Sequence, residues 1–242
     1  MRPLLVLWDV DFTLIDASGS GQRLYQKALR DMYGLELPRT GQSFGGRTDS
    51  AIALEILALA GVPDPKDQLL RFQDYLSQLA GDLWEDVRRN GRALPGAEDI
   101  LAALALGTHG QPVIQSLLTG NLPELARVKL SALELTEHLD FTIGAYGDIS
   151  AVRADLVQVA QAKAAARHGG DFGGRYTVLV GDTPSDVEAA LANDASVVAV
   201  ASGSFSAAEL MTAGAHVVLP DLANTPVALA AILSAPTAAA AA

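Results

Sequence analysis

The chain has 242 residues, of which 50% are hydrophobic and 19% are charged, so it can bury one large core or a core with an inserted unit. Its formal net charge is −11, from 17 Lys and Arg against 28 Asp and Glu. Nucleic acids and anionic membranes bind clustered cations, so this composition argues against both as partners. The chain has no cysteine, which excludes disulfides, thiolate metal sites and a cysteine nucleophile.

The first apolar run, Leu4–Trp8, ends where Asp9 interrupts it. A signal peptide or a membrane span needs a longer apolar run than this. We therefore expect a cytoplasmic protein. Its composition is compatible with a monomer and with a homodimer, and both stay open.

Short apolar runs predict the strands of the fold. Most of the runs are continuously apolar, which is typical of parallel strands that are covered on both faces. The predicted strands are Leu4–Trp8, Pro112–Leu118, Phe141–Ala145, Thr177–Val180, Val197–Ala201 and Val217–Leu219. Helical patterns fill the later gaps, at Leu122–Leu133, Ala154–His168, Ser185–Ala192, Ser206–Ala213 and Thr225–Ser234. This alternation predicts an α/β fold with a doubly wound parallel sheet.

The stretch between the first two predicted strands is about a hundred residues long, although a crossover needs only about a dozen. Helical periodicity fills it, at Gln22–Tyr33, Asp49–Ala60 and Lys66–Arg89, before a return helix at Ala97–Leu106. We therefore predict an α/β core formed by residues 1–17 and 92–242. An all-helical cap subdomain, residues 18–91, is inserted after the first strand.

Polar residues follow three of the predicted strands. Asp9 and Asp11 follow the first strand, Thr119–Asn121 follow the second, and Asp182 and Asp186 follow the fourth. The carboxyl ends of parallel strands meet at one edge of a sheet, where ligands bind. Carboxylates crowded there repel one another and are costly to bury unpaired. Oxygen ligands suit a hard divalent cation, so we predict a Mg²⁺ site; for Asp186 alone, a helix N-cap is the alternative.

These segments resemble the motifs of the haloacid dehalogenase superfamily. Its first motif is Asp-x-Asp-x-Thr after the first strand, its second is a Ser or Thr after the second strand, and its fourth is Gly-Asp-x-x-x-Asp or a close variant. Asp9–Thr13, Thr119 and Gly181–Asp186 match these motifs in order. Gly46–Asp49 and Leu94–Gly96 are similar to stretches of the phosphoglycolate-phosphatase-like branch. The resemblance implies a Rossmann-type core, an inserted helical cap and a phosphoric monoester hydrolase.

The resemblance also implies the catalytic roles of the carboxylates. Asp9 would be the nucleophile and would form an aspartyl-phosphate that water then hydrolyses. Asp11 would protonate the leaving oxygen and later deprotonate that water. Mg²⁺ would be held by the carboxylates of Asp9 and Asp182, by the main-chain carbonyl of Asp11, and by Asp186 directly or through water.

The same resemblance implies how the phosphate is bound. Thr119, Gly120 and Asn121 would hold it beside the start of a helix. The family usually has a Lys after the third strand, and here Arg153 stands at that place. We predict that Arg153 offsets the phosphate charge. Lys129 is the rival, but its helical spacing predicts a solvated position.

Two further residues depart from the family or lie in the insert. Phe12 stands where many relatives have Gly, which predicts a different backbone or a ring that lines the cleft; a buried packing role is the alternative. Arg47 follows two glycines and precedes a predicted helix. We predict that Arg47 contacts the distal part of the substrate. A salt bridge to Asp49 or a side chain that faces solvent is the alternative.

The predicted function is Mg²⁺-dependent hydrolysis of a small phosphorylated metabolite. A phosphosugar mutase of the same superfamily has the same catalytic residues and is the alternative. A phosphoacceptor signalling module also uses Asp, Mg²⁺, Thr and a basic residue, but it is about half as long and has no helical insert. A dehalogenase is disfavoured by Asp11, because that branch does not use a second Asp as acid and base.

Overall fold

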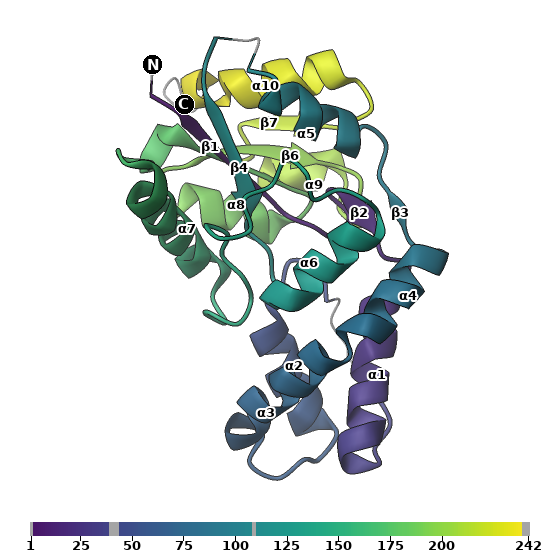
Figure 1. Cartoon of the computed structure of the whole chain (residues 1–242). Coiled ribbons are helices and arrows are strands. Elements are labelled where there is room, and N and C mark those ends of the chain that lie inside the picture. Colours follow the sequence, from purple (N-terminus) through teal and green to yellow (C-terminus); the bar gives the residue numbers. More distant parts are fainter. Residues whose placement is uncertain (1, 39–43, 108–109, 239–242) are drawn as a thin grey trace.

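A five-stranded parallel sheet forms the centre of the fold. The structure is a computed structural model, and it describes residues 2–38, 44–107 and 110–238. The strands lie in the order β4-β1-β5-β6-β7 (Figure 1). Their bounds are β1 Leu4–Trp8, β4 Val113–Leu117, β5 Thr177–Gly181, β6 Ser196–Val200 and β7 Val217–Leu219. This arrangement confirms the predicted doubly wound α/β fold.

Both faces of the sheet are covered by helices, as the continuously apolar strands predict. Along β1, Leu4, Val6 and Trp8 join one core cluster, whereas Leu5 and Leu7 join the other. Each of these fully buried side chains contributes about 1.5–3 kcal/mol of transfer free energy. One face is covered by α5 (Ala97–Ala105) and α10 (Thr225–Ala238), the other by α7 (Arg153–His168) and α8 (Pro184–Leu191) (Figure 1).

The core contains three further elements in the described part of the chain. They are α6 (Pro123–Ala132), the 3₁₀ turn η1 (Gly174–Tyr176) and α9 (Ala207–Thr212). None of the helices in the described part of the chain combines the length and the apolar composition that crossing a bilayer requires.

The prediction of a strand at Phe141–Ala145 is wrong. Only Ala145 pairs with the sheet, as an isolated bridge to Leu118 beside β4. The residues before it satisfy their polar groups locally instead. Thr142 donates its main-chain N–H and its hydroxyl to the Asp140 carboxylate, and the Tyr146 hydroxyl donates to the Phe141 carbonyl. These turn interactions replace the ladder that an apolar run alone predicts.

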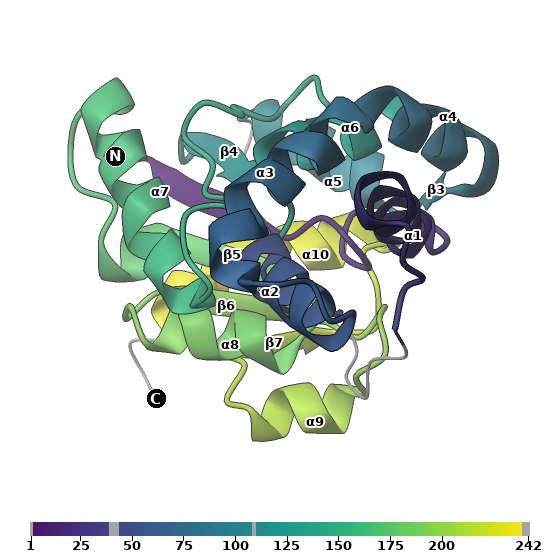
Figure 2. The same ribbon diagram turned by 90° about the horizontal axis from the view of Figure 1, so that it is seen from below.

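Four helices lie outside the sheet and form what we call the helical lobe, namely α1 (Ser20–Tyr33), α2 (Asp49–Leu59), α3 (Pro65–Gln78) and α4 (Ala80–Asn90). In Figure 1 the lobe lies below the carboxyl ends of the strands, towards which the β4 arrow points. Figure 2, seen from below, places α2 and α3 in front of the sheet. The lobe therefore stands at the edge where the polar residues follow the strands.

The single helix predicted at Lys66–Arg89 is two helices in the structure. Leu79 ends α3 and precedes α4, with a φ of −82° and a ψ of 10°. The predicted apolar spacing survives the break, because Phe72, Leu76, Leu83 and Val87 are all buried. Gly81 follows closely, and the low helix propensity of glycine weakens a continuous helix at this point.

Two short strands join the lobe to the core. β2 (Ile15–Asp16) pairs antiparallel with β3 (Arg92–Ala93), and the Arg92 guanidinium lies 2.6 Å from the Asp16 carboxylate. The chain thus leaves and re-enters the core at one place. The limits of the insert at residues 18 and 91 stay a prediction.

The return of the chain from the lobe depends on Gly96, which precedes α5 with a φ of 80°. A Cβ atom there would lie 1.9 Å from the Leu222 carbonyl oxygen. Gly61 has a similar φ of 76°, but no atom lies within 4 Å of its Cβ position. An alanine at Gly96 would therefore suffer both backbone strain and close packing, whereas an alanine at Gly61 would suffer backbone strain alone.

We predict that Gly96→Ala lowers the free energy of unfolding by about 3 kcal/mol, since it combines a left-handed alanine with overpacking. Gly61→Ala, the matched control, should cost about 1 kcal/mol, from the backbone alone. Urea unfolding of the two variants measures both values. Equal losses in the two variants would contradict the packing argument.

Candidate active site

The register of the sheet brings three strand ends together. Trp8 of β1 pairs with Leu117 of β4 on one side and with Val180 of β5 on the other. Asp9 continues β1, and its N–H donates to the Val180 carbonyl at 2.9 Å. Because β1 lies between β4 and β5, the residues that follow all three strands meet around Asp9, at the point where the winding of the sheet changes direction.

Three aspartates form a buried carboxylate cluster at this edge. The ligand oxygens of Asp9, Asp182 and Asp186 lie within 4.8 Å of one another. Asp9 follows β1, Asp182 follows β5, and Asp186 is in the first turn of α8. Thr13, the last residue of the first motif, donates its hydroxyl to Asp182 at 3.3 Å.

Asp186 lies in the carboxylate cluster and also takes part in the capping of α8, as the N3 residue of a helix whose N-cap is Thr183. Its Oδ2 accepts the N–H and the hydroxyl of Thr183 at 3.1 and 2.7 Å, which completes a capping box. Its Oδ1 lies 2.6 Å from the Arg153 guanidinium. The capping box fixes the Asp186 carboxylate through its Oδ2, and Oδ1 is directed at the cluster.

Arg153 is the cation of the cluster. Its Nη2 lies 2.9 Å from Asp9 and also donates to the Leu118 carbonyl at 3.2 Å. The side chain is 6% exposed, and the residue begins α7. The sequence predicts that Arg153 offsets the phosphate charge, and the structure places its guanidinium beside Asp9, at the edge where the phosphate is expected.

The cluster carries more negative charge than Arg153 offsets. Burial, with the carboxylates of Asp9 and Asp186, raises the pKa of Asp182 to about 9. Burial also raises the pKa of Asp9 to about 6, against the opposing effect of Arg153. A divalent cation would restore the balance, and an all-oxygen donor set suits Mg²⁺. The residues present therefore fit the predicted metal.

Lys129 does not lie on a solvated face of its helix, which corrects the sequence-based expectation. It is 5% exposed, and its Nζ lies 2.6 Å from the Asp11 carboxylate and 2.6 Å from the Asn121 side-chain oxygen. Lys129 shares one face of α6 with the buried Leu122, Leu125 and Leu130. That apolar spacing is the sequence signal that reveals its buried position.

Asp11 is held apart from the carboxylate cluster by these donors. Its Oδ2 accepts from Lys129 and also from the Asn121 amide, at 2.8 Å. The Asn121 amide also donates to the Thr119 hydroxyl oxygen at 2.9 Å. Asp9 and Asp11 thus stand in different environments, one beside Arg153 and the other beside Lys129.

Residues 119–122, which we call the 119–122 loop, connect β4 to α6. Thr119 is fully buried, and α6 begins at Pro123 with Leu122 as its N-cap. A Cβ atom on Gly120 would lie 1.9 Å from the Arg47 carbonyl, so no other residue fits there. The loop lies at a helix N-terminus, which favours an anion.

Phe12 is not a buried packing residue. Its φ is 60°, in the left-handed region that favours glycine, and 42% of the residue is exposed. The Ser202 hydroxyl donates to its carbonyl. The backbone therefore turns as a glycine would turn it, and the ring lies in the wall of the cavity described below.

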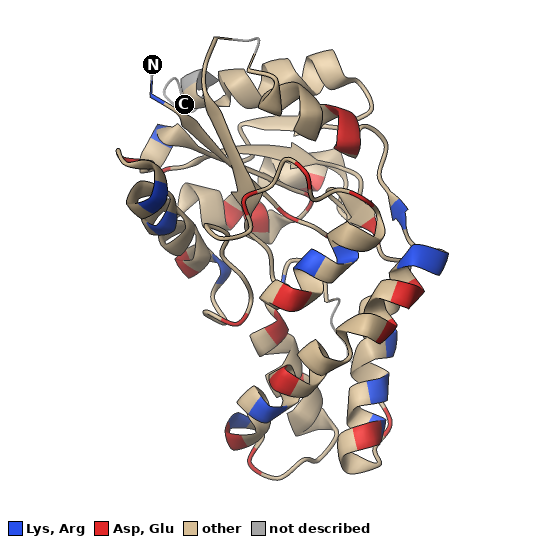
Figure 3. Cartoon of the chain, viewed as in Figure 1, with Lys and Arg blue, Asp and Glu red and all other residues tan. Residues whose placement is uncertain are grey.

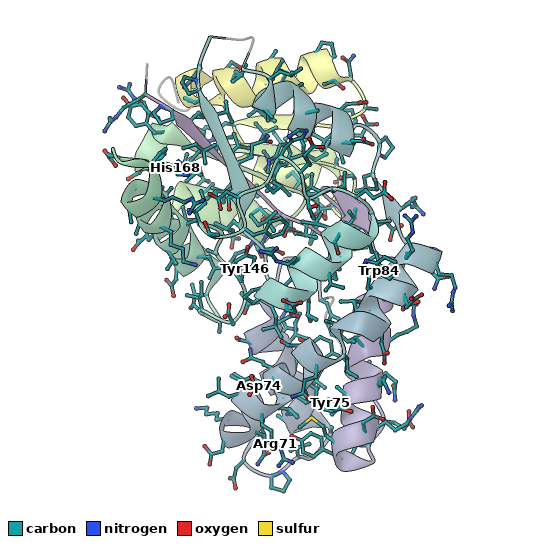
Figure 4. The ribbon with its side chains drawn as sticks, in the orientation of Figure 1. Arg71, Asp74, Tyr75, Trp84, Tyr146 and His168 are labelled. Carbon is teal, nitrogen blue, oxygen red and sulfur yellow. The ribbon has the colours of Figure 1, made fainter. Side chains whose placement is uncertain are left out.

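Arg47 contacts Glu55 rather than Asp49. Its side chain is 23% exposed, and it lies in the wall of the same cavity. In Figure 4 the labelled Arg71, Asp74 and Tyr75 lie at the end of the lobe away from the sheet, so these polar residues do not reach the cavity.

A cavity of about 390 Å³ lies between the core and the helical lobe. Its core wall includes Asp9, Asp11, Thr119, Lys129 and Arg153, and its lobe wall includes Phe44, Arg47 and Ile52. Figure 3 shows acidic segments at this edge of the sheet, with basic and acidic residues together on α6. The structure thus brings every predicted site residue except Asp186 to one cavity, and Asp186 lies directly behind Arg153.

Sequence reasoning missed Asp49 as a site residue. The sequence predicts a helix that begins at Asp49, and in the structure Thr48 caps this helix, α2, by accepting from the Ala51 N–H. The Asp49 side chain instead crosses to the core, where it accepts from the Leu122 N–H at 2.7 Å. Nothing in the sequence spacing indicates a contact between residues this far apart.

Comparisons with known proteins show the family and the fold of the chain. The model of a family described as haloacid dehalogenase-like hydrolase matches residues 6–191. No curated protein matches the chain. Among solved structures, a hydrolase from Pseudomonas syringae is similar at 22% identity and a TM-score of 0.65, with 96% of this chain and 99% of that chain covered.

Two other solved structures show the same fold. A predicted phosphatase from Clostridium acetobutylicum is 18% identical with a TM-score of 0.69, and 97% of this chain and 100% of that chain are covered. A protein named as a β-phosphoglucomutase, from Bacteroides vulgatus, is 16% identical with a TM-score of 0.63, covering 97% and 90%. At these identities the likeness concerns the fold. The family model spans most of the chain, and the chain therefore belongs to the haloacid dehalogenase-like hydrolases.

Proposed function

We propose that this protein is a Mg²⁺-dependent phosphatase that hydrolyses a small phosphorylated metabolite through an aspartyl-phosphate on Asp9. The observation that carries the proposal is the placement of Asp9. Its buried carboxylate contacts Arg153 and lies in one cavity with Asp11 and the 119–122 loop. A volume of about 390 Å³ suits a small ligand. The cytoplasmic location expected from the sequence stays part of the proposal.

The first half of the proposed reaction forms the covalent intermediate. An oxygen of the Asp9 carboxylate attacks phosphorus while the bond from phosphorus to the ester oxygen breaks. Asp11 donates a proton to that leaving oxygen, which departs as an alcohol. Arg153 and the Thr119 hydroxyl hold the charged phosphoryl oxygens. In the second half, Asp11 accepts a proton from water as that water attacks phosphorus, and the bond from phosphorus to Asp9 breaks.

Mg²⁺ would be held by the carboxylates of Asp9, Asp182 and Asp186 and by the Asp11 carbonyl oxygen, and it would neutralise charge between the nucleophile and the phosphate. The cavity wall supplies the other functions. Lys129 and Asn121 orient Asp11 through its Oδ2. Arg47 and Phe12 line the outer part, where we propose that they contact the remainder of the substrate.

The phosphosugar mutase remains the second candidate, because it uses the same residues. It is separated from a phosphatase by its products. A hexose 1-phosphate converted to the 6-phosphate without release of inorganic phosphate would favour the mutase. Membership of the hydrolase family favours the phosphatase over a signalling phosphoacceptor.

The metal assignment predicts that the protein hydrolyses an aryl phosphate with Mg²⁺ and loses this activity in a chelator. Added Mg²⁺ should restore it, and Ca²⁺ should inhibit, because its larger and looser coordination shell misplaces the nucleophile. Release of inorganic phosphate measures the activity. Undiminished turnover in the chelator would contradict the metal assignment.

Substitutions of the two carboxylates of the first motif should have different effects on turnover. Asp9→Asn should abolish turnover, since an amide is a far weaker nucleophile than a carboxylate. Asp11→Asn should retain phosphate binding and lose at least ~10²-fold in kcat, as expected for a missing general acid and base. Circular dichroism checks that both variants fold. Near-normal rates in Asp9→Asn would show that another group attacks.

Arg153 and Lys129 should give different patterns of loss. Arg153→Ala should lower kcat/KM by at least ~10²-fold on every phosphate ester, because it removes charge stabilisation at the reacting group. Lys129→Met disturbs Asp11, so its loss should be larger for an alkyl phosphate, whose leaving oxygen needs a proton, than for an aryl phosphate.

Matched controls are available on the same helices. Arg167→Ala removes an arginine of α7 whose side chain is 55% exposed, and Arg127→Ala removes an exposed arginine of α6. Both should keep the wild-type rates. An equal loss of activity on both esters in Lys129→Met, with Arg153→Ala as active as the wild type, would show that Lys129 rather than Arg153 offsets the phosphate charge.

A further inference from the structure

Asp49 joins the helical lobe to the core through its buried carboxylate. It is the first residue of α2, and 7% of it is exposed. Its Oδ1 accepts the Tyr25 hydroxyl of α1 at 2.8 Å, and its Oδ2 accepts the Leu122 N–H at the start of α6 at 2.7 Å. One side chain thus connects two lobe helices to the 119–122 loop.

Main-chain hydrogen bonds surround this contact. The Asp49 N–H donates to the Gly120 carbonyl at 2.6 Å, and the Ser50 N–H donates to the Gly147 carbonyl at 3.2 Å. The Gly147 N–H in turn donates to the Asn121 carbonyl at 2.9 Å. A Cβ atom on Gly147 would lie 1.8 Å from the Gly120 carbonyl oxygen. The loops of the lobe and the core therefore pack backbone against backbone.

The charge of Asp49 is stabilised by its position between two helices. It lies in the first turn of α2 and contacts the N-cap amide of α6, and both helix ends carry partial positive charge. Burial raises the pKa of Asp49, and Lys129 and the Leu122 amide oppose this effect. A buried carboxylate cannot itself bind phosphate favourably. Its contribution is to hold the loop.

We infer that Asp49 is a positioning residue that holds the 119–122 loop in its phosphate-binding conformation only while the lobe rests on the core. This inference rests on the proposed function, since it assigns phosphate to that loop. Docking of the lobe and binding of phosphate are then linked, and each strengthens the other.

The test compares Asp49→Ala with Asp49→Asn in the full chain. Asp49→Ala removes the acceptor for the Leu122 N–H, so amide hydrogen exchange of residues 117–122 in the free protein should accelerate about tenfold or more. Inhibition by orthovanadate, a phosphate analogue, should weaken by a similar factor. Asp49→Asn keeps a side-chain oxygen and should lie closer to the wild type in exchange. Asp67→Ala, which removes an exposed carboxylate from the first turn of α3, is the control.

The outcomes separate this inference from the function on which it rests. Unchanged exchange and unchanged vanadate inhibition in folded Asp49→Ala would overturn it, and so would tighter vanadate binding. If Asp49→Ala does not fold, Tyr25→Phe removes the other hydrogen bond, and faster exchange of the same residues is expected; unchanged exchange would overturn the inference. Failure of the proposed function appears instead as a wild type without phosphatase activity or vanadate inhibition, whereas the exchange test needs neither.

Discussion

The buried contact of Arg153 with Asp9 and Asp186 is the interaction on which the site depends. Removing carboxylates from water costs several kcal/mol for each ion, and an unpaired charge is tolerated poorly. Arg153 offsets part of this cost, while the capping box of α8 holds Asp186 in place. The remaining negative charge and the oxygen donors of the cluster fit a divalent cation. We propose that a divalent cation bound at this edge offsets the excess negative charge and so allows an anionic phosphate to bind beside it.

The chain separates its two motif-one carboxylates by giving each its own cation. Asp9 contacts Arg153 from α7, and Asp11 contacts Lys129 from α6. Two carboxylates in different environments can act as nucleophile and as acid or base within one cavity. The lobe completes the arrangement from the opposite side, where Asp49 contacts the start of α6. Because Asp49 and Asp11 both contact the 119–122 loop, the position of the lobe bears on the proposed phosphate site.

The sequence predicts those parts of the structure that follow from periodicity and strand order. Asp9, Thr119 and Asp182 lie together because parallel strands in register end at one edge. Periodicity failed where local polar groups decided the outcome, as at Phe141–Ala145, whose ladder is replaced by turn hydrogen bonds to Asp140. The spacing of Lys129 predicts a solvated face, whereas the residue lies on the same face as the buried Leu125. The contact of Asp49 with Leu122 was not predicted, since no strand order or spacing relates the start of an inserted helix to a residue 73 positions away.

Trapping of the covalent intermediate tests the account most directly. Aspartyl-phosphates are acyl phosphates, which borohydride reduces, so treatment during turnover with Mg²⁺ should convert residue 9 to homoserine. Peptide mass spectrometry identifies the residue, and a sample without substrate is the control. The account predicts homoserine at residue 9 alone, and only in the presence of substrate. Reduction at Asp11 or Asp182 instead, or none during steady turnover, would contradict it.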